Sequence, residues 1–189
     1  QFGSTSDRLS LGISFMQEHG SALGMQSFAI DQSLTSVSRA IDLGYMAQID
    51  NNVSINANAQ IGATTSNGQG MWDGQEGTTF SAYGLALNFT NVFAGNDSIV
   101  ASVRQPIAID GGSMSVALPQ ARDIDGNVSS GIFDIDLAPS DRQLDLGLEY
   151  EVPLDRFESV RFGAAYILNS GNVTGETSLG LAMSYSLEF

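Results

Sequence analysis

Apolar and polar side chains alternate along most of the chain with a period of two residues, which is typical of β-strands. The clearest case is the last stretch, whose odd-numbered residues are apolar or aromatic and whose even-numbered residues are small or polar. Its apolar set is Leu179, Leu181, Met183, Tyr185, Leu187 and Phe189. Each segment of this kind is expected to have one apolar face and one polar face.

The same alternation predicts further strands over residues 9–15, 41–50, 53–62, 82–89, 143–152 and 160–166, and weaker strands over 21–30, 97–107, 112–118 and 128–137. Clusters of Gly, Asn and Asp, which favour hairpin turns, lie at residues 18–20, 50–52, 94–97, 110–112 and 125–127. Residues 66–77, which include Trp72, are interpreted as a long surface loop. Consecutive strands, about eleven in all, are therefore expected to pair antiparallel.

The composition of the polar face separates two classes of β-protein. A soluble sandwich or jelly roll would expose Lys, Glu, Arg and Thr on this face and would pack its apolar face against a second sheet. Here Ser, Gly, Ala, Asn and Gln dominate the polar face, and Lys is scarce. Small residues suit the crowded interior wall of a barrel, so the composition favours a membrane barrel, with the soluble sandwich as the alternative.

Charge and chain length exclude several other classes. The 7 Lys plus Arg stand against 21 Asp plus Glu, and the net charge of −14 would repel nucleic acid. No apolar run approaches the roughly 20 residues that a membrane helix needs. The absence of Cys excludes a disulfide framework and a thiolate metal site. The start at Gln1 is typical of a processed product or a fragment.

We therefore expect a single domain over residues 1–189 that is all-β, an antiparallel up-and-down transmembrane β-barrel of about 12 strands, since bacterial barrels have an even number. Its apolar face would contact outer-membrane lipid, with aromatic side chains near the strand ends. Its polar face would line a lumen, as a hydrated wall, a cation-attracting pore or a track for an unfolded chain. The residues predicted to face the lumen are Asp42, Asp50, Asp145, Glu149, Glu151 and Arg161, with Asp134 and Asp136, and with Arg39, Arg104 and Arg142 as pairing partners.

Candidate chemistry is sparse. His19 is the only His and falls in a predicted turn, so no nucleophile has a positioned base, and we expect the chain not to be an enzyme. Residues 123–134 loosely match a Ca²⁺ loop, but Val128 occupies the sixth position, where such a loop needs Gly. An Asp-Gly hairpin turn explains the same residues, so no metal or cofactor is expected.

Two features of the sequence resemble outer-membrane proteins. The C-terminal residues Tyr185, Leu187 and Phe189 resemble the signal by which the outer-membrane barrel assembly machinery engages its substrates. A larger part of the chain, roughly residues 7–189, resembles the autotransporter-like C-terminal β-barrel domain of subtilisin-like serine proteases from sphingomonad-type α-proteobacteria. The matching stretches are Arg104-Gln105-Pro106-Ile107, residues 114–119 and Leu137-Ala138-Pro139-Ser140-Asp141-Arg142-Gln143-Leu144-Asp145-Leu146.

The resemblance implies a translocator domain in the outer membrane of a Gram-negative bacterium, which anchors or exports an N-terminal passenger domain that can be cleaved off. Asp141 and Gln143 depart from the family pattern, where Gly and Glu are usual. Family barrels have twelve strands as a rule, and a plug helix often precedes them. Neither that helix nor the Ser motif of the passenger protease occurs in this sequence.

Two other functions remain open at this point. One is a structural barrel or β-sheet subunit of a surface assembly or filament, whose apolar face is covered by neighbouring subunits. The other is a small diffusion pore that prefers cations, because its wall is acidic.

Overall fold

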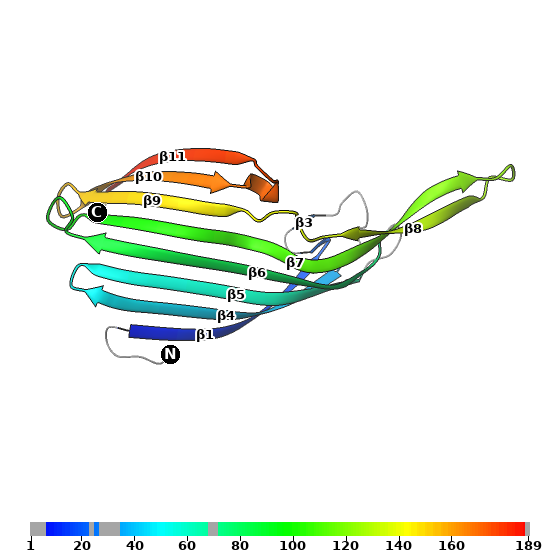
Figure 1. Ribbon diagram of the computed structural model, residues 1–189, viewed down its shortest axis with the longest axis horizontal. Coiled ribbons are helices and arrows are strands. Elements are labelled where there is room, and N and C mark those ends of the chain that lie inside the picture. Colours follow the sequence, from blue (N-terminus) through cyan, green and yellow to red (C-terminus); the bar gives the residue numbers. More distant parts are fainter. Residues whose placement is uncertain (1–6, 23–24, 27–34, 68–71, 188–189) are drawn as a thin grey trace.

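The chain folds into a curved antiparallel sheet (Figure 1). The computed structural model describes residues 7–22, 25–26, 35–67 and 72–187. The nine-stranded sheet has the order β1(Asp7–His19), β4(Thr35–Asp50), β5(Val53–Asn67), β6(Trp72–Thr90), β7(Ser98–Arg122), β9(Leu144–Pro153), β10(Glu158–Leu168) and β11(Thr177–Leu187), with β8(Val128–Asp136) paired to β7. A separate pair is formed by β2(Ser21–Ala22) and β3(Met25–Gln26), and the helical element of the described residues is the short η1(Ser170–Asn172).

All of these strand pairs are antiparallel, so the predicted all-β up-and-down architecture is confirmed. Among the described residues, no helix has the length and apolar character needed to span a membrane. The outer strands β1 and β11 are not paired with each other, so the sheet is open rather than closed.

The register keeps the apolar side chains of neighbouring strands on one face. Partners in an antiparallel pair project to the same side, so a row of partners can be followed across the sheet. One such row is Leu9, Tyr45, Ala57, Leu85, Val103, Leu146, Tyr166 and Leu179. The adjacent row on the other face is Ser10, Gly44, Asn58, Gly84, Arg104, Asp145, Ile167 and Ser178. The alternation in the sequence thus becomes an apolar face and a mostly polar face.

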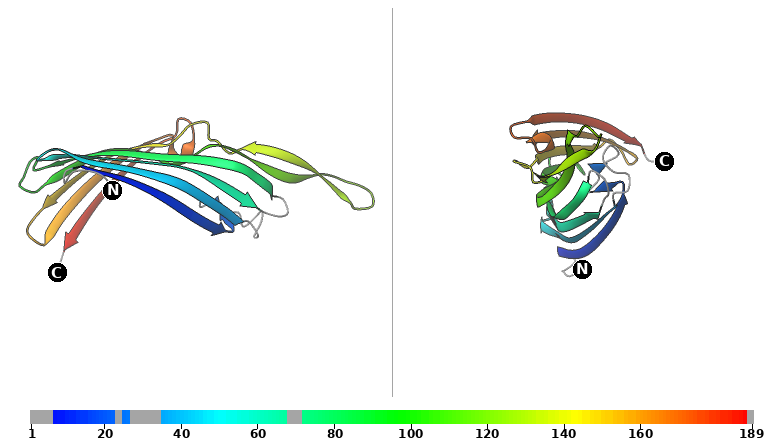
Figure 2. Two further views of the ribbon diagram at one scale, coloured as in Figure 1. Left: turned by 90° about the horizontal axis from the view of Figure 1, so that it is seen from below. Right: turned by 90° about the vertical axis from the view of Figure 1, so that its right-hand side faces the viewer.

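The polar face is the concave one. Figure 2 shows the sheet curling along its width, with β1 and β11 at the two edges. A hollow on the polar face is lined both by Asn56 and Asn58 of β5 and by Gly180 and Ala182 of β11. Because these two strands are separated by β6, β7, β9 and β10 in the sheet, the sheet must curve towards this side.

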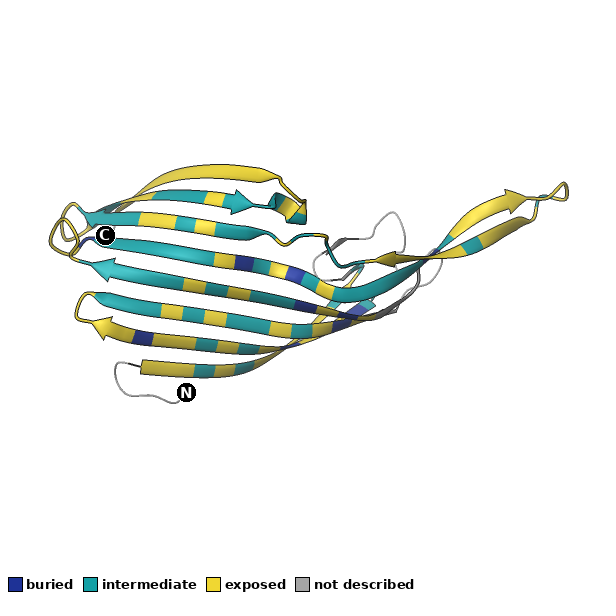
Figure 3. Ribbon diagram, in the orientation of Figure 1, coloured by how far each residue is buried: buried dark blue, intermediate teal, exposed yellow. Residues whose placement is uncertain are grey.

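The convex face has no second layer against it within the described residues. Leu11, Phe15 and Leu181 are 72%, 73% and 78% exposed, and Figure 3 shows that exposed positions run along the strands. The buried apolar side chains are Ala40, Ala47, Phe80, Ala108 and Val116. The two-layer core that a soluble sandwich requires is therefore not formed by this part of the chain.

The two ends of the sheet differ in their connections. β4–β5, β6–β7 and β9–β10 are joined at one end through residues 51–52, 91–97 and 154–157, and β1 begins and β11 ends there as well. We call this the short-turn end. At the opposite, long-connection end, β1 is joined to β4 through residues 20–34, and β7 extends with β8 as a hairpin beyond the rest of the sheet (Figure 1).

Several predicted boundaries are confirmed, and others were wrong. The turns at residues 50–52, 94–97 and 125–127 are confirmed, with Asn96 and Gly126 at positive φ. The turn predicted at 110–112 is instead the interior of β7, where Gly112 has a φ of 141° and the register with β6 shifts. Gly112 bends the strand without reversing it, because β6 continues to pair on both sides of the bend.

The loop predicted over residues 66–77 also proved mostly extended, since β5 runs to Asn67 and β6 begins at Trp72. Backbone pairing such as that of Trp72 with Val116 does not require side-chain alternation. Of the weak strand predicted over 21–30, only β2 and β3 fall within the described residues.

Gly62 provides a test of packing on the concave face. A Cβ atom at this position would overlap the ring of Phe80 and stand 2.6 Å from the backbone carbonyl oxygen of Arg39. We expect Gly62→Ala to lower the free energy of unfolding by about 1–3 kcal/mol, since a backbone oxygen cannot move aside like a side chain. Urea unfolding followed by far-UV circular dichroism measures the change. Gly180→Ala, with no atom within 4 Å of its added Cβ, is the matched control, and equal effects of the two substitutions would contradict the prediction.

Candidate functional site

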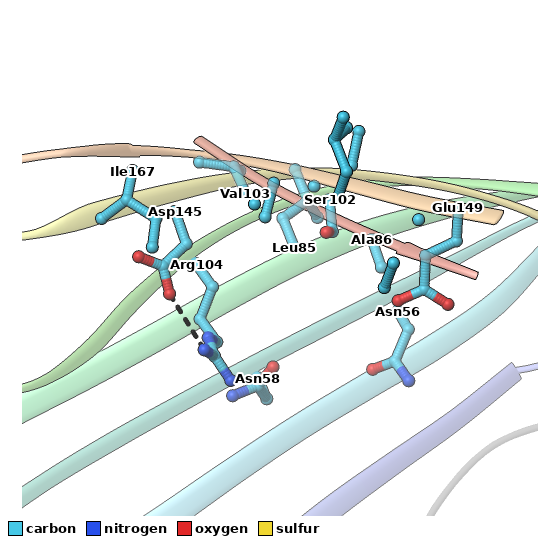
Figure 4. A pocket seen from close by; sticks show the side chains of 17 residues that line it. Asn56, Asn58, Leu85, Ala86, Ser102, Val103, Arg104, Asp145, Glu149 and Ile167 are labelled. Atoms are coloured by element: carbon cyan, nitrogen blue, oxygen red, sulfur yellow. Dashed lines mark hydrogen bonds and ion pairs between the residues drawn. The ribbon is translucent and has the colours of Figure 1, made fainter. Parts of the chain in front are cut away.

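The main candidate site is the hollow on the concave face, with a volume of about 590 Å³ (Figure 4). Asn56, Asn58, Arg104, Asp145 and Glu149 are among the residues that line it. Glycine and alanine on β9, β10 and β11 make up much of the remaining wall, which leaves room between the strands. Small residues on this face are what a narrow concave wall requires.

Ion pairs and hydrogen bonds hold the charged groups of this wall in place. The Arg104 guanidinium lies 2.9 Å from the Asp145 carboxylate, which also accepts a 2.7 Å hydrogen bond from the Gln143 amide (Figure 4 shows the ion pair). Further towards the short-turn end, Arg161 contacts Glu151 at 2.7 Å. Both guanidinium groups are more than half exposed, so water screens these pairs and each contributes about 0–1 kcal/mol.

Asp42 is held by hydrogen bonds rather than by a cation. Its carboxylate accepts 3.0 Å and 2.6 Å bonds from Ser14 of β1 and Gln60 of β5, the strands on either side of β4. The carboxylates of Asp42, Asp145 and Glu151 are thus held in place by side chains of neighbouring strands or of the adjoining loop.

The register places most of the predicted lumen-facing residues on the concave face. Asp42, Asp145, Glu149, Glu151 and Arg161 lie in its rows. Asp50 does not, because the register shifts between Gln48 and Asp50 and sets Asp50 opposite Val53, beside the turn. There its carboxylate accepts a 2.6 Å hydrogen bond from the Asn51 backbone.

The arginines predicted to pair with the lumen-facing carboxylates lie in different parts of the structure. Arg104 is on the concave face, whereas Arg39 stands opposite Phe15 and Ala63 and so belongs to the convex face. Arg142 lies between β8 and β9 and contacts Asp110 at 2.6 Å. Asp134 and Asp136 are in the hairpin, where the Asp134 carboxylate accepts a 2.7 Å bond from the Ser115 hydroxyl.

The concave face is filled towards the long-connection end. Ser38, Thr64 and Thr78 form one row across β4, β5 and β6, and all three are buried. The hydroxyls of Ser38 and Thr64 share a 2.6 Å hydrogen bond. In the next row, buried Phe80 covers Gly62. Towards the long-connection end, the open hollow is therefore followed by rows of packed, buried side chains.

The turn between β6 and β7 is organised by one buried carboxylate. Asp97 is fully buried and accepts hydrogen bonds of 2.6 Å, 2.9 Å and 3.0 Å from the backbone N–H groups of Val92, Phe93 and Ala94. The Tyr150 hydroxyl of β9 donates a fourth, of 3.1 Å. Burial by itself raises the pKa of the Asp97 carboxyl, but these hydrogen bonds outweigh it and hold the pKa below its usual value.

The acidic tip of the β7–β8 hairpin folds onto itself. The Asp123 carboxylate accepts hydrogen bonds from the side chain and backbone of Asn127 and from the backbone of Asp125, which lowers the pKa of Asp123. Within the described residues, no group of three or more His, Cys, Asp or Glu side chains is placed to hold a metal ion. His19, at the end of β1 opposite Thr35, does not line the hollow.

The segment that resembles the translocator family connects β8 to β9 and is tied to the loop between β10 and β11. The Gln143 backbone donates to the Asn172 side chain, and the Gln143 amide oxygen accepts from the Gly171 backbone. The Thr174 hydroxyl donates to the Asp141 carboxylate. Sequence reasoning did not identify this network or the Asp97 turn, since both join residues distant in sequence through loops that have no periodic pattern.

Comparison of the chain with protein-family models, curated proteins and solved structures finds no match.

The Asp97 turn predicts a pH dependence of stability. Because the pKa of Asp97 is lowered in the folded state, its ionised carboxylate stabilises the fold above the unfolded value of about 3.9, and this contribution is lost as the pH falls through the folded value. Asp97→Asn should lower the urea midpoint at pH 7, and its difference from the wild type should shrink below about pH 4.

Asp125→Asn, at the hairpin tip, is the matched control and should leave the urea midpoint at pH 7 nearly unchanged. A gap between wild type and Asp97→Asn that is as large at pH 3 as at pH 7 would show that ionisation of Asp97 does not stabilise the turn.

Proposed function

We propose that this chain is a translocator-type β-barrel domain of the bacterial outer membrane, which anchors or exports an N-terminal passenger. The observation that carries the proposal is the contrast between the two faces of the sheet. The convex face is apolar and exposed, whereas the concave face holds small residues, amides and ion pairs. This arrangement suits lipid outside and water inside.

The energetics of the convex face favour lipid over water. Burying one large apolar side chain is worth about 1.5–3 kcal/mol, and the convex face exposes many of them. Strand lengths agree with a membrane crossing, since β9, β10 and β11 contain 10, 11 and 11 residues and a tilted strand needs roughly 9–11 to span the bilayer.

The free edges of β1 and β11 support closure into a barrel. In hydrocarbon, each unpaired backbone N–H or C=O costs several kcal/mol, so a membrane-spanning sheet needs both edges paired. The path from β1 to β11 holds eight strands, so we propose that further strands, which the described residues do not include, lie between these edges and complete a barrel of about 12 strands, as the family resemblance implies. The curvature towards the polar face is in the direction that such closure requires.

The orientation follows from the two ends of the sheet. Outer-membrane barrels have short turns on the periplasmic side and longer loops outside. We therefore assign the short-turn end to the periplasm, and the hairpin of β7 and β8 to the cell exterior. Tyr185 and Leu187 then lie near the periplasmic rim, where the barrel assembly machinery would engage them, while Phe189 lies outside the described residues.

The export role itself rests on the family resemblance. The rows of buried side chains on the concave face bear on the alternative functions. Buried Ser38, Thr64, Thr78 and Phe80 narrow the interior at the long-connection end, which speaks against a permanently open diffusion pore. A structural subunit would also cover the convex face, but with protein. Behaviour in detergent separates that alternative from the membrane barrel.

The first test is heat-modifiable folding. We expect the purified chain to become rich in β-structure only in detergent or lipid, and to migrate faster on a gel when unboiled, because a closed barrel resists denaturation by dodecyl sulfate. Gel mobility with and without boiling, alongside circular dichroism, measures both properties. A β-rich monomer in plain buffer would refute the membrane barrel, and ordered multimers without detergent would favour the structural subunit.

The second test addresses export and assembly. A small reporter is joined ahead of Gln1, behind a secretory leader, in a host that has an outer membrane. We expect surface-accessible reporter with the wild-type barrel, and at least a severalfold loss for Tyr185→Ala combined with Leu187→Ala, which removes apolar side chains of the proposed assembly signal. Protease accessibility on intact cells is the measurement.

The control variant for this test is Ser184→Ala combined with Ser186→Ala, which changes the opposite face of the same strand and should retain display. Reporter that remains periplasmic while the barrel itself reaches the membrane would contradict export and leave only anchoring.

A further inference from the structure

Arg39 is a cation on the mostly apolar convex face. It stands opposite Phe15 of β1 and Ala63 of β5, in the convex-face row next to that of Ile13, Ile41 and Ile61. Of the chain's basic residues, all of them arginines, Arg104, Arg142 and Arg161 form ion pairs, whereas the Arg39 guanidinium has no ion pair or hydrogen bond within the described part of the chain. Its charge is therefore available to a ligand.

A depression in the convex face surrounds this cation. It has a volume of about 590 Å³, and Ile13, Phe15, Ile41 and Ile61 line it together with Arg39. Thr79 and Asp110 also line it, which places polar groups beside the apolar ones. Asp110 is already engaged, because its carboxylate contacts Arg142 at 2.6 Å and accepts a 2.9 Å hydrogen bond from Ser81.

Arg39 lies at the end of the apolar run of β4, where the surface of a bilayer crossed by this strand would be. The apolar positions Ile41, Leu43, Tyr45, Ala47 and Ile49 lie between it and the short-turn end, and this run is about as long as a tilted strand needs to cross the hydrocarbon. On the same face, Val37 and then Thr35 follow towards the other end. A cation is costly at the middle of a bilayer and is tolerated at its surface, where it can meet headgroups.

We propose that Arg39 and this depression bind a phosphate-bearing membrane lipid, in the leaflet on the long-connection side. The planar guanidinium suits a phosphate group, with which it can form paired hydrogen bonds. The acyl chains would lie along Ile13, Ile41 and Ile61. This site rests on the proposed membrane function and specifies one of the barrel's lipid contacts.

The test compares two lipids that have the same acyl chains. The protein is folded in dodecyl maltoside micelles and titrated with phosphatidylglycerol or phosphatidylcholine, and bound lipid is counted by native mass spectrometry. The wild type should bind phosphatidylglycerol about tenfold more tightly, a size typical of losing charge-assisted hydrogen bonds. Arg39→Gln should abolish the preference, and Arg39→Lys, which keeps the charge, should retain most of it.

Arg8→Gln is the matched control, because Arg8 is an exposed arginine of β1 whose pairing with Met46 places it on the polar face. It should keep the full preference for phosphatidylglycerol. Equal preference in Arg39→Gln and the wild type, or no preference in either, would overturn the lipid site. Competition by soluble glycerol phosphate as strong as that by phosphatidylglycerol would also overturn it, since a free anion would then suffice.

The two proposals fail in different ways. A protein that folds in micelles but shows no preference for phosphatidylglycerol contradicts only the lipid site. A protein that does not fold in micelles contradicts the membrane barrel, and the lipid site with it.

Discussion

The hydrogen-bonded register between neighbouring strands decides which side chains share a face, because partners in an antiparallel pair project to the same side. A slip of one residue would move the whole apolar set of a strand onto the polar face. The register holds from Leu9 on β1 to Leu179 on β11, through a succession of seven pairings. The short-turn end helps to fix it, since the shift at Asp50 and the buried Asp97 carboxylate each define how one strand leads into the next.

Once the faces are separated, the curvature of the sheet gives them different environments. The concave side is crowded, so it holds Gly, Ala, Ser and Asn, and two of its arginines pair with carboxylates of neighbouring strands, as Arg104–Asp145 and Arg161–Glu151. The convex side has room for Leu, Ile, Phe and Tyr but no second layer to cover them in the described residues. The stability of this sheet therefore depends on what covers its convex face. In a globular domain, by contrast, the core supplies most of the apolar burial.

Period-two alternation predicted the strands most reliably where both neighbours are regular, as in β9, β10 and β11. It failed at Gly111–Gly112, since a glycine at positive φ can bend a strand that remains paired as well as end it. It failed again at Trp72, whose pairing with Val116 is a long-range backbone contact that no local pattern reports. The concave placement of Asp145 and Glu151 follows from alternation. Asp50 instead lies beside the turn because of a register shift, and Arg39 lies on the convex face because it has the parity of Ile41.

The acidic side chains of the concave wall are held by contacts that join neighbouring strands. On this wall Asp145 and Glu151 each face an arginine, and Asp42 accepts hydrogen bonds from two neighbouring strands. The buried carboxylate of Asp97 accepts hydrogen bonds from three backbone N–H groups of its own turn and from Tyr150 of β9, so here too an acidic group maintains the shape of the sheet.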